Sequence, residues 1–391
     1  MGMKKVSSAS FDVIVLGSGA AGLGAADAFA SRGLRTAVMA PSSVSGAASP
    51  RAAGILDPLL EQNQQSPLIP AAIEAFRRFP EFLERLKKST GSDALYRQTG
   101  MLYLSSNPFE RRELERRFKW QKKWMPSLEL LSKSQVLERF PNVHPKILSG
   151  LFYPEVGKIN APEFLRIFKK HLKKNGVHFL EDLKPPRIKS GLPGKGVQVG
   201  FRGRVWNARF VVNAAGAWAG QKGLSAKRLS VKPVRGQMLV LKAQRSHSVI
   251  LHSLSGGYLV PWEKGIHLAG STVEYAGYRD RVTVEGRKGI LKRISKVCPE
   301  VLEMKEVGCW AGLRPRSGGG MPLLGPVPGQ PCVYAATGYF RSGILLSSFF
   351  GGLLADSIML GKVSPLMKPF LPADSGKKFS RSHSEHGGQG S

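Results

Sequence analysis

A glycine-rich turn near the N-terminus constrains the fold of this chain more than any other feature. Residues 17–22 read GSGAAG, and they follow the apolar, β-branched run of residues 11–16. Residues 23–31 are rich in alanine and predict a helix that ends at Gly33, and residues 36–40 predict a second strand. This order of strand, glycine turn, helix and strand is typical of a doubly wound parallel sheet that binds a dinucleotide.

The spacing of the glycines gives each of them a separate task. Gly17 permits the tight turn after the strand, Gly19 lets the backbone approach a pyrophosphate, and Gly22 lets the helix pack closely on the strand. Ala20 and Ala21 lie between Gly19 and Gly22 in the same turn, directly before the predicted helix. The N–H groups and the partial positive charge of a helix N-terminus favour phosphate, so these residues are expected to bind the cofactor.

The ribose-binding end of the motif departs from the usual pattern. An acidic residue normally ends the second strand and binds the ribose hydroxyls, but this chain has Ala40 there. Ser42 and Ser43 follow closely and are expected to be weaker partners. The change affects the adenosine contact and leaves the fold prediction intact.

Two further segments favour FAD over NAD as the dinucleotide. Residues 45–56, SGAASPRAAGIL, are rich in small side chains, so their backbone can approach a flat ring closely. Residues 211–219, VVNAAGAWA, bring a second strand and glycine to the same groove. The expected cofactor contacts in these parts of the chain are Ser42, Ser49, Ala53, Gly54, Ile55, Ala215 and Gly216.

Hydrophobic periodicity along the rest of the chain predicts both helices and strands. Helices are expected at residues 70–88, 108–124, 162–175, 286–298 and 343–359, and further strands at 101–105, 209–214 and 333–337. Short strands separated by turns are expected at residues 237–242, 258–261 and 266–271. Such a run of strands favours an antiparallel sheet that is separate from the parallel one.

The order of these elements predicts an α/β fold with a discontinuous Rossmann-type FAD-binding domain. We expect that domain to comprise residues 1–80, 155–230 and 325–371. Residues 81–154 and 231–324 should form an α+β substrate domain built on the antiparallel sheet. The tail, residues 372–391, is rich in Ser, Gly, Lys and His and is expected to be disordered.

Charge and cysteine content bear on partners and location. The formal net charge is +31, from 58 Lys and Arg against 27 Asp and Glu. Such a charge attracts anionic substrates or partners, and a basic bias of the whole proteome would give the same charge on a solvated surface. The three cysteines lack a CxxC pair, so neither a disulfide framework nor a metal site is expected, and reduced thiols suit a cytoplasmic protein. No uninterrupted apolar run of about 18 residues predicts a membrane span.

Motifs in the C-terminal half carry a family resemblance. Residues 310–315 read WAGLRP, residues 338–345 read GYFRSGIL, and residues 257–261 read GYLVP after PVRG at 233–236. In this order, with the N-terminal glycine turn, they resemble the D-amino-acid oxidase superfamily of FAD-dependent oxidoreductases. The match is to its glycine oxidase branch, which is tied to thiamine biosynthesis. Tyr339 stands where that branch has His, and Ser342 where it has Asn.

The resemblance implies a catalytic set. Arg314 would bind the substrate carboxylate, Tyr258 would assist, and Arg341 would lie near the substrate and the flavin. Arginine suits this task because its planar fork pairs with both carboxylate oxygens. The resemblance also implies FAD contacts at Gly338, Tyr339, Arg341, Ser342, Gly343 and Ile344. Tyr275 and Tyr278 follow the strand at 266–271, so they can approach the pocket.

The implied reaction is oxidative deamination of glycine, sarcosine or a small D-amino acid. A hydride passes from the α-carbon to flavin N5, water hydrolyses the resulting imine, and O₂ or another acceptor takes the electrons, giving H₂O₂ in the case of O₂. The cofactor supplies this chemistry and the protein supplies binding and orientation. A catalytic histidine or carboxylate pair is therefore not required.

Other functions fit the same fold. A tRNA-modifying relative would oxidise the carboxymethylaminomethyl group of a wobble uridine, with the basic segments 109–124 and 169–174 on phosphates and Trp120 and Trp124 as stacking surfaces. A salt-dependent tRNA gel shift would reveal it. A membrane-associated D-amino-acid dehydrogenase would pass electrons to quinone and use its basic surface on anionic lipid. An FAD-binding scaffold without catalysis is disfavoured by Arg314, and a homo-oligomer is compatible with each function.

Overall fold

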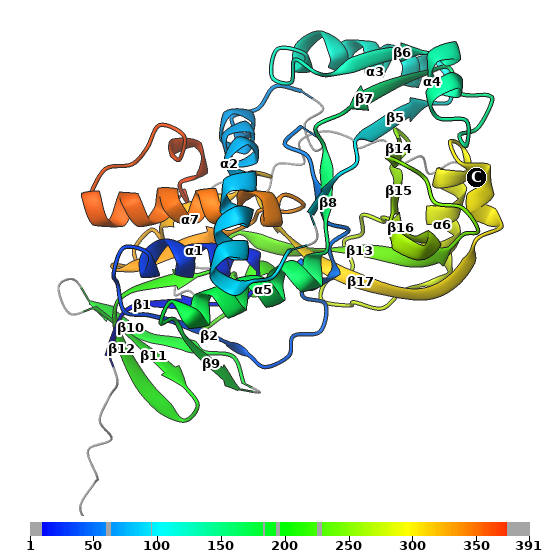
Figure 1. The fold of residues 1–391 in the computed structure, drawn as a ribbon. Coiled ribbons are helices and arrows are strands. Elements are labelled where there is room, and N and C mark those ends of the chain that lie inside the picture. The colour runs from blue at the N-terminus through cyan, green and yellow to red at the C-terminus, as the bar shows by residue number, and fades with distance from the viewer. Residues whose placement is uncertain are drawn as a thin grey trace, which may run out of the picture.

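Two large sheets organise the chain, one mainly parallel and one mainly antiparallel (Figure 1). The structure is a computed structural model that describes residues 10–59, 64–94, 96–182, 184–192, 196–224 and 229–373. The predicted α/β fold with a Rossmann-type parallel sheet and a separate antiparallel sheet is confirmed.

The parallel part of the first sheet is centred on β1 (Ser10–Leu16). β2 (Thr36–Pro41) and β12 (Arg204–Asn213) flank β1, β9 (His178–Asp182) pairs with β2, and β19 (Val333–Thr337) pairs with β12. All five strands run parallel, so their carboxyl ends form one edge of the sheet. Ligands of open α/β sheets bind outside that edge.

The long strand β12 joins the parallel strands to an antiparallel extension. Its first half pairs with β11 (Gly196–Phe201), which pairs in turn with β10 (Arg187–Leu192). Its second half pairs with β19, and β18 (Leu323–Pro326) lies antiparallel beside β19. The sequence analysis did not predict the β10–β11 hairpin.

Helices pack against the parallel sheet through small residues. α1 (Ala20–Ala30) and α7 (Gly343–Leu360) cross where a β-carbon on Gly24 would lie 2.0 Å from the carbonyl oxygen of Ser347. Only glycine permits this separation, so Gly24 sets the distance between the two helices. Figure 1 shows α2 and α5 beside this pair. Their bounds are Leu68–Thr90 and Ala161–Lys174.

The apolar helix α7 belongs to this core. Among the described residues it alone has the length and hydropathy to cross a membrane. Its Phe350 and Leu354 are fully buried in the hydrophobic cluster that α1, α2 and α7 share. We therefore describe α7 as a core helix.

The second sheet has the strand order β17, β13, β16, β15, β14, β5, β7, β6, and all neighbours pair antiparallel except β14 and β5. Its strands are β5 (Met101–Ser105), β6 (Glu129–Ser132), β7 (Ser149–Tyr153), β13 (Val231–Lys242), β14 (Ile250–Ser253), β15 (Gly257–Pro261), β16 (Ile266–Gly270) and β17 (Lys305–Ser317). Three helices pack on it: α3 (Pro108–Gln121), α4 (Lys133–Arg139) and α6 (Val284–Ser295).

A small third sheet lies where the two large ones approach each other. It consists of β3 (Ile55–Leu56), β8 (Gly157–Ile159) and β4 (Tyr96–Gln98). β3 continues the small-residue loop that follows β2, so this sheet fixes one end of that loop. The N–H of Ile159 donates to the carbonyl oxygen of Gly54 at 2.9 Å.

All six predicted helices are present, with shifts of a few residues at their ends. The predicted helix at 108–124 ends at Gln121, for example. The predicted domain boundaries stay a prediction, and residues 374–391 of the predicted tail lie outside the described residues.

The stacking role expected for Trp120 and Trp124 stays a prediction. Both indole rings pack against a hydrophobic cluster under α3, and their ring nitrogens are buried. Both residues are half-buried beneath the basic helix.

Candidate active site

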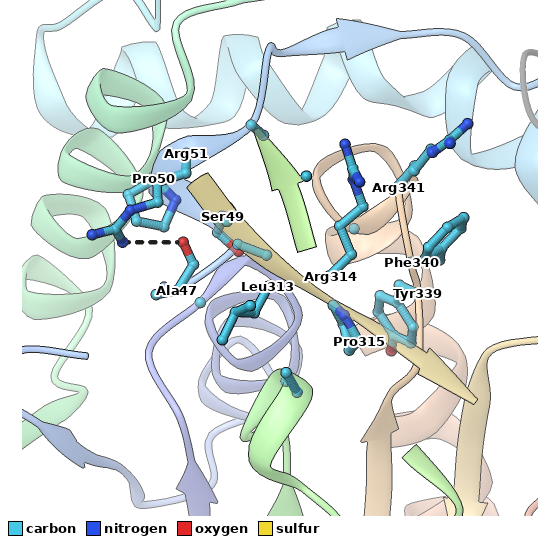
Figure 2. A pocket seen from close by; sticks show the side chains of 18 of the residues that line it. Ala47, Ser49, Pro50, Arg51, Leu313, Arg314, Pro315, Tyr339, Phe340 and Arg341 are labelled. Atoms are coloured by element: carbon cyan, nitrogen blue, oxygen red, sulfur yellow. Dashed lines mark hydrogen bonds between the residues drawn. The ribbon is translucent and has the colours of Figure 1, made fainter. Parts of the chain in front are cut away.

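A single large cavity connects the two sheets. Its volume is about 1970 Å³, and its wall runs from the carboxyl edge of the parallel strands to the second sheet (Figure 2). The wall takes residues from the β1–α1 turn, the loop after β2, strands β13, β15 and β17, and the turn before α7. Segments that are far apart in the sequence therefore meet around one space.

The glycine turn forms one end of this cavity with its backbone. Gly17 has φ of +117°, and a β-carbon there would lie 2.5 Å from the carbonyl oxygen of Ala214. A β-carbon on Gly22 would lie 2.0 Å from the carbonyl oxygen of Gly17, so α1 packs directly on the turn. α1 begins at Ala20, which lines the cavity. The partial positive charge of the helix therefore faces the place where a pyrophosphate is expected.

Ser49 completes this end from the loop after β2. Its hydroxyl oxygen accepts a hydrogen bond from the N–H of Ala20 at 3.1 Å. In the same loop Gly54 has φ of +79°, and a β-carbon there would lie 1.9 Å from the carbonyl oxygen of Ile159. Small residues therefore let the loop lie against both the helix start and the third sheet.

The carboxyl end of β2 offers hydroxyl groups where a carboxylate is usual. Ser42 and Ser43 line the cavity beyond Ala40, and the N–H of Ser42 donates to the carbonyl oxygen of Asp182 at 2.7 Å. This bond ties the loop to β9 and keeps Ser42 beside the expected ribose position. Lys169 of α5 also lines the cavity.

Arg314 is held in one position at the other end of the cavity. Its Nη1 donates to the carbonyl oxygen of Thr272 at 3.0 Å, and its Nη2 donates to Oγ of Ser271 at 2.7 Å. The guanidinium lies over Gly236 of the neighbouring strand β13, where a β-carbon would come within 2.2 Å of both Nη atoms. Gly236 is therefore necessary for this position of the guanidinium.

Tyr258 of β15 and Arg341 from the turn before α7 line the cavity together with Arg314. Figure 2 shows Arg314 and Arg341 coming from different elements and extending toward the same end of the pocket. Two guanidinium groups thus border one space, which favours an anionic ligand. We call this end the substrate chamber and define it by Tyr103, Arg117, His252, Tyr258, Arg314 and Arg341.

Most of the residues predicted from the sequence form the cavity wall. They are Gly17, Gly19, Ala20, Ala21, Ser42, Ser49, Ala53, Gly54, Ile55, Ala215, Gly216, Tyr258, Arg314, Tyr339, Arg341, Gly343 and Ile344. Gly22, Gly338 and Ser342 are not in the wall: Gly22 packs α1 on the turn, Gly338 has φ of +76°, and Ser342 is the N-cap of α7. The assignment of all these residues to FAD or substrate stays a prediction.

The two tyrosines after β16 differ in position. Tyr275 lines the cavity and is exposed. Tyr278 is tied to the first sheet, because its hydroxyl donates to the carbonyl oxygen of Ala217 at 3.2 Å and its ring packs against Trp218 at 5.8 Å between centroids. Tyr278 therefore anchors the segment that carries Tyr275 over the cavity.

Three buried polar residues of the substrate chamber were not predicted from the sequence: Tyr103, Arg117 and His252. A signal for Arg117 existed. The buried positions of α3 are Glu110, Leu114, Arg117 and Gln121, and their helical spacing places Arg117 on the inner face. No sequence pattern distinguishes His252 from the other histidines.

His252 is a neutral imidazole in this setting. Burial lowers the pKa of His252 to about 3, and the nearby charges of Arg117 and Arg341 act in the same direction. Its Nδ1 lies 2.9 Å from the carbonyl oxygen of Ser253. Since a carbonyl oxygen only accepts, Nδ1 carries the proton and donates this bond.

The cavity as a whole fits an elongated dinucleotide with a flat ring. A β-carbon on Gly17 or Gly22 would collide with backbone and shift the turn that lines one end of the cavity, and Ala53 and Gly54 line the same cavity as Leu313 and Arg314 of β17. The cations at the far end favour a small anion there. Among the described residues, no group of His, Cys, Asp and Glu side chains is arranged for a metal ion.

Comparisons with known proteins agree with this geometry. A family model described as "FAD dependent oxidoreductase" (DAO) matches residues 12–357. Glycine oxidase of Geobacillus kaustophilus is 28% identical over 92% of this chain and 96% of its own, and glycine oxidase of Pseudomonas aeruginosa is 29% identical over 93% and 99%. The crystal structure of the Geobacillus kaustophilus glycine oxidase superposes with a TM-score of 0.86 at 26% identity, covering 94% of this chain and 99% of that one.

Proposed function

The chain belongs to the DAO family of FAD-dependent oxidoreductases, and we propose that it oxidises glycine, sarcosine or a small D-amino acid at the carbon next to the carboxylate. It is an FAD-dependent amino-acid oxidase of the glycine oxidase type. The choice of substrate, a cytoplasmic location and a part in thiamine biosynthesis are proposals that rest on this likeness and on the chamber.

The position of Arg314 is the observation that carries the proposal. Its guanidinium is fixed from behind by Ser271 and Thr272 and lies in the cavity wall on β17. A fixed planar fork can pair with both oxygens of a carboxylate, and such a pair sets the direction of the rest of a small molecule. The α-carbon and the amine of a bound amino acid would then extend into the cavity.

Three residues of the chamber have a task in the proposed reaction. When bound, FAD supplies the acceptor for the hydride that leaves the α-carbon, and passes the electrons to O₂ or another acceptor. Arg314 holds the substrate carboxylate, and Arg341 adds positive charge beside it. Tyr258 offers a hydroxyl group to the same carboxylate. The lone pair of the neutral amine forms the C=N bond as the hydride leaves, and water then hydrolyses the imine to an oxo acid and ammonia or a primary amine.

Positioning is the main contribution of the protein. Holding two reacting groups in a productive geometry accounts for a large part of many rate enhancements, up to about 7–11 kcal/mol in favourable cases. Three hydrogen-bonding groups around one carboxylate achieve this because they leave the substrate little freedom to rotate. The neutral His252 adds no competing charge and does not attract the carboxylate away from Arg314.

A substrate panel tests the proposal directly. We expect the purified protein to be yellow. Under anaerobic conditions, glycine, sarcosine, D-alanine or D-proline should bleach its flavin absorbance at about 450 nm. Oxygen consumption without an added acceptor then separates an oxidase from a quinone-linked dehydrogenase. A yellow protein that none of the four compounds bleaches would contradict the proposal.

A further inference from the structure

One buried glutamine contacts both ends of the segment that holds Arg314. The segment is residues 272–283, which lie between β16 and α6. Arg314 donates to the carbonyl oxygen of Thr272, the first residue of the segment, at 3.0 Å. Gln237 of β13 is completely buried, and its backbone N–H donates to Oγ1 of the same Thr272 at 2.9 Å. Thr272 therefore contacts both Gln237 and the guanidinium that it orients.

The side chain of Gln237 joins the two ends of this segment. Its Nε2 donates to Oε1 of Glu274 at 2.7 Å and to Oγ1 of Thr283 at 3.3 Å. Its Oε1 accepts from the N–H of Thr283, the N-cap of α6, at 2.8 Å. Both amide hydrogens and the amide oxygen are thus used, as is usual for a buried amide. A single side chain therefore attaches the start and the end of the segment to β13.

Gly286 in the first turn of α6 leaves the space for this amide. A β-carbon there would lie 2.3 Å from both Nε2 and Oε1 of Gln237. Glycine destabilises a helix relative to alanine, so its presence here reflects the space that the amide needs. Gly236 leaves space for the Arg314 guanidinium in the same way. Two neighbouring residues of β13 therefore accommodate the guanidinium and fix the segment that holds it.

Glu274 completes the attachment of the segment to β13. Its backbone N–H donates to the carbonyl oxygen of Arg235 at 3.0 Å, and its carbonyl oxygen accepts from the N–H of Arg235 at 2.9 Å. Its carboxylate accepts from Nε of Arg235 at 2.6 Å and from the amide of Gln237. The segment is thus attached to β13 on either side of Gly236, at Arg235 and at Gln237. The guanidinium at Gly236 lies between these two attachments.

We propose that Gln237 is a positioning residue for the carboxylate subsite, because it fixes the segment whose Thr272 orients the Arg314 guanidinium. This inference rests on the proposed function, in which Arg314 pairs with the substrate carboxylate. Without the amide, the N–H of Thr283 and the carboxylate of Glu274 each lose a partner, and the segment can shift enough to alter a bidentate pair. Gln237 is not among the described residues that line the cavity, so it acts through Arg314 and does not touch the substrate.

The affinity for a simple carboxylate measures this role. Acetate is glycine without its amine, and its binding to the FAD-loaded protein is measured by the change in the flavin spectrum. Gln237→Leu removes the hydrogen bonds of the side chain and keeps much of its volume. We expect this variant to raise the Kd of acetate and the KM of the best amino acid at least about tenfold. The FAD content should equal that of the wild type, and kcat should change less than about threefold, because a contact made equally in the ground and transition states affects mainly KM.

An exchanged pair tests whether the hydrogen bond to Glu274 is the link. Gln237→Glu alone places two carboxylates together and should raise the Kd of acetate as Gln237→Leu does. The double variant Gln237→Glu/Glu274→Gln exchanges the amide and the carboxylate, so the charge of the pair is unchanged and a hydrogen bond between the two positions is retained. Its Kd for acetate should return to within about threefold of the wild-type value.

Ser105→Ala is the control for a loss of stability alone. Ser105 of β5 and Ser149 of β7 are buried in the same sheet, and their hydroxyl oxygens lie 2.8 Å apart in a hydrogen bond. Neither is among the described residues that line the cavity. This change should lower the unfolding midpoint and leave the Kd of acetate unchanged. If Gln237→Leu loses FAD, Thr272→Val serves in its place, because it removes only the hydroxyl that accepts from Gln237, and it should raise the Kd of acetate at least about threefold.

The outcomes separate this inference from the proposed function. If Gln237→Leu, or Thr272→Val in its place, has a lower unfolding midpoint but the wild-type Kd for acetate, Gln237 only stabilises the fold and the inference is wrong, while the proposed function stands. An exchanged pair that fails to restore acetate binding would also contradict the inference. If no amino acid bleaches the wild-type flavin, the proposed function fails, and the Kd values for acetate still decide the role of Gln237. Wild-type protein that does not bind acetate either would overturn both.

Discussion

The two ends of the cavity are built in different ways. The dinucleotide end consists largely of backbone from one continuous segment, residues 17–22, in which glycine is required by contacts as short as 2.0 Å to a would-be β-carbon. The substrate chamber consists of side chains from β5, β14, β15, β17, α3 and the turn before α7. The dinucleotide end has almost no room for an added atom. The substrate chamber, in contrast, can change its specificity through the substitution of single side chains. Damage to the first should remove the cofactor, and damage to the second should spare the cofactor and impair turnover.

The largest effect is expected for Gly22→Ala. Its β-carbon would lie 2.0 Å from the carbonyl oxygen of Gly17, so α1 or the turn must move away from the pyrophosphate position. We predict protein that is purified without FAD and has no oxidase activity, as measured by its absorbance spectrum and by oxygen uptake.

Gly352→Ala is the matched control for this variant. Gly352 is also helical, but a β-carbon at this position would have no other atom within 4 Å, and the change should retain FAD and stabilise α7 by up to about 1 kcal/mol. Yellow, active Gly22→Ala protein would show that the tight turn is not what holds the cofactor.

Gly236→Ala should impair the substrate chamber, with a smaller loss of activity than Gly22→Ala. The added methyl group would take the place of the Arg314 guanidinium, whose bonds to Ser271 and Thr272 would be lost or distorted. Losing the equivalent of one charged hydrogen bond costs about 1.5–3 kcal/mol, so we expect kcat/KM to fall about tenfold to a hundredfold with FAD content unchanged. Steady-state oxygen uptake measures kcat/KM, and the flavin spectrum measures the FAD content.

Gly308→Ala is the control in the same pair of strands. A β-carbon there would lie 3.6 Å from the nearest atom of Val240, which is an ordinary contact. Its kcat/KM should equal that of the wild type. If Gly236→Ala also has wild-type kinetics, the conformation of Arg314 does not depend on the glycine beneath it.

The smallest predicted effect is on the pH dependence of the free energy of unfolding. It should arise from buried histidines of the second sheet. Burial lowers the pKa of His252 to about 3, of His267 to about 4, and lowers that of His247 as well. In the unfolded chain these groups bind protons below about pH 6.5. The unfolded state therefore takes up more protons as the pH falls from 6.5 toward 4, and the free energy of unfolding should fall by up to about 1.4 kcal/mol per pH unit for each histidine.

Urea unfolding at pH 7.5 and pH 5.0 measures this dependence. His267→Gln should reduce the pH dependence, because it removes one of the buried imidazoles. A free energy of unfolding that stays constant or rises on acidification would contradict the neutral, buried state of these histidines.

The sequence predicted the dinucleotide end well because that end depends on local chemistry. The GSGAAG turn, the strand before it and the helix after it are contiguous, so residue spacing alone gives their geometry. The departure at Ala40 was also visible, and the structure places Ser42 and Ser43 in the wall beyond it.

The substrate chamber could be predicted only in part. Arg314 and Tyr258 stood out through family motifs, but nothing local shows that Gly236 lies under Arg314 or that β14 brings His252 beside Tyr103. Those contacts depend on strand pairing across long separations in the sequence. Arg117 was hidden among the exposed cations of a basic helix, and only the register of its buried face distinguishes it.

The central claim is that the Arg314 guanidinium holds the carboxylate of a small amino acid in the cavity. Rapid anaerobic mixing of wild-type, Arg314→Lys and Arg314→Leu protein with the best substrate, followed at the flavin band, tests it most directly. We predict that FAD content is equal in all three, that the second-order rate of bleaching falls by at least about a hundredfold in Arg314→Leu, and that Arg314→Lys lies between. A bleaching rate in Arg314→Leu equal to that of the wild type would contradict the account.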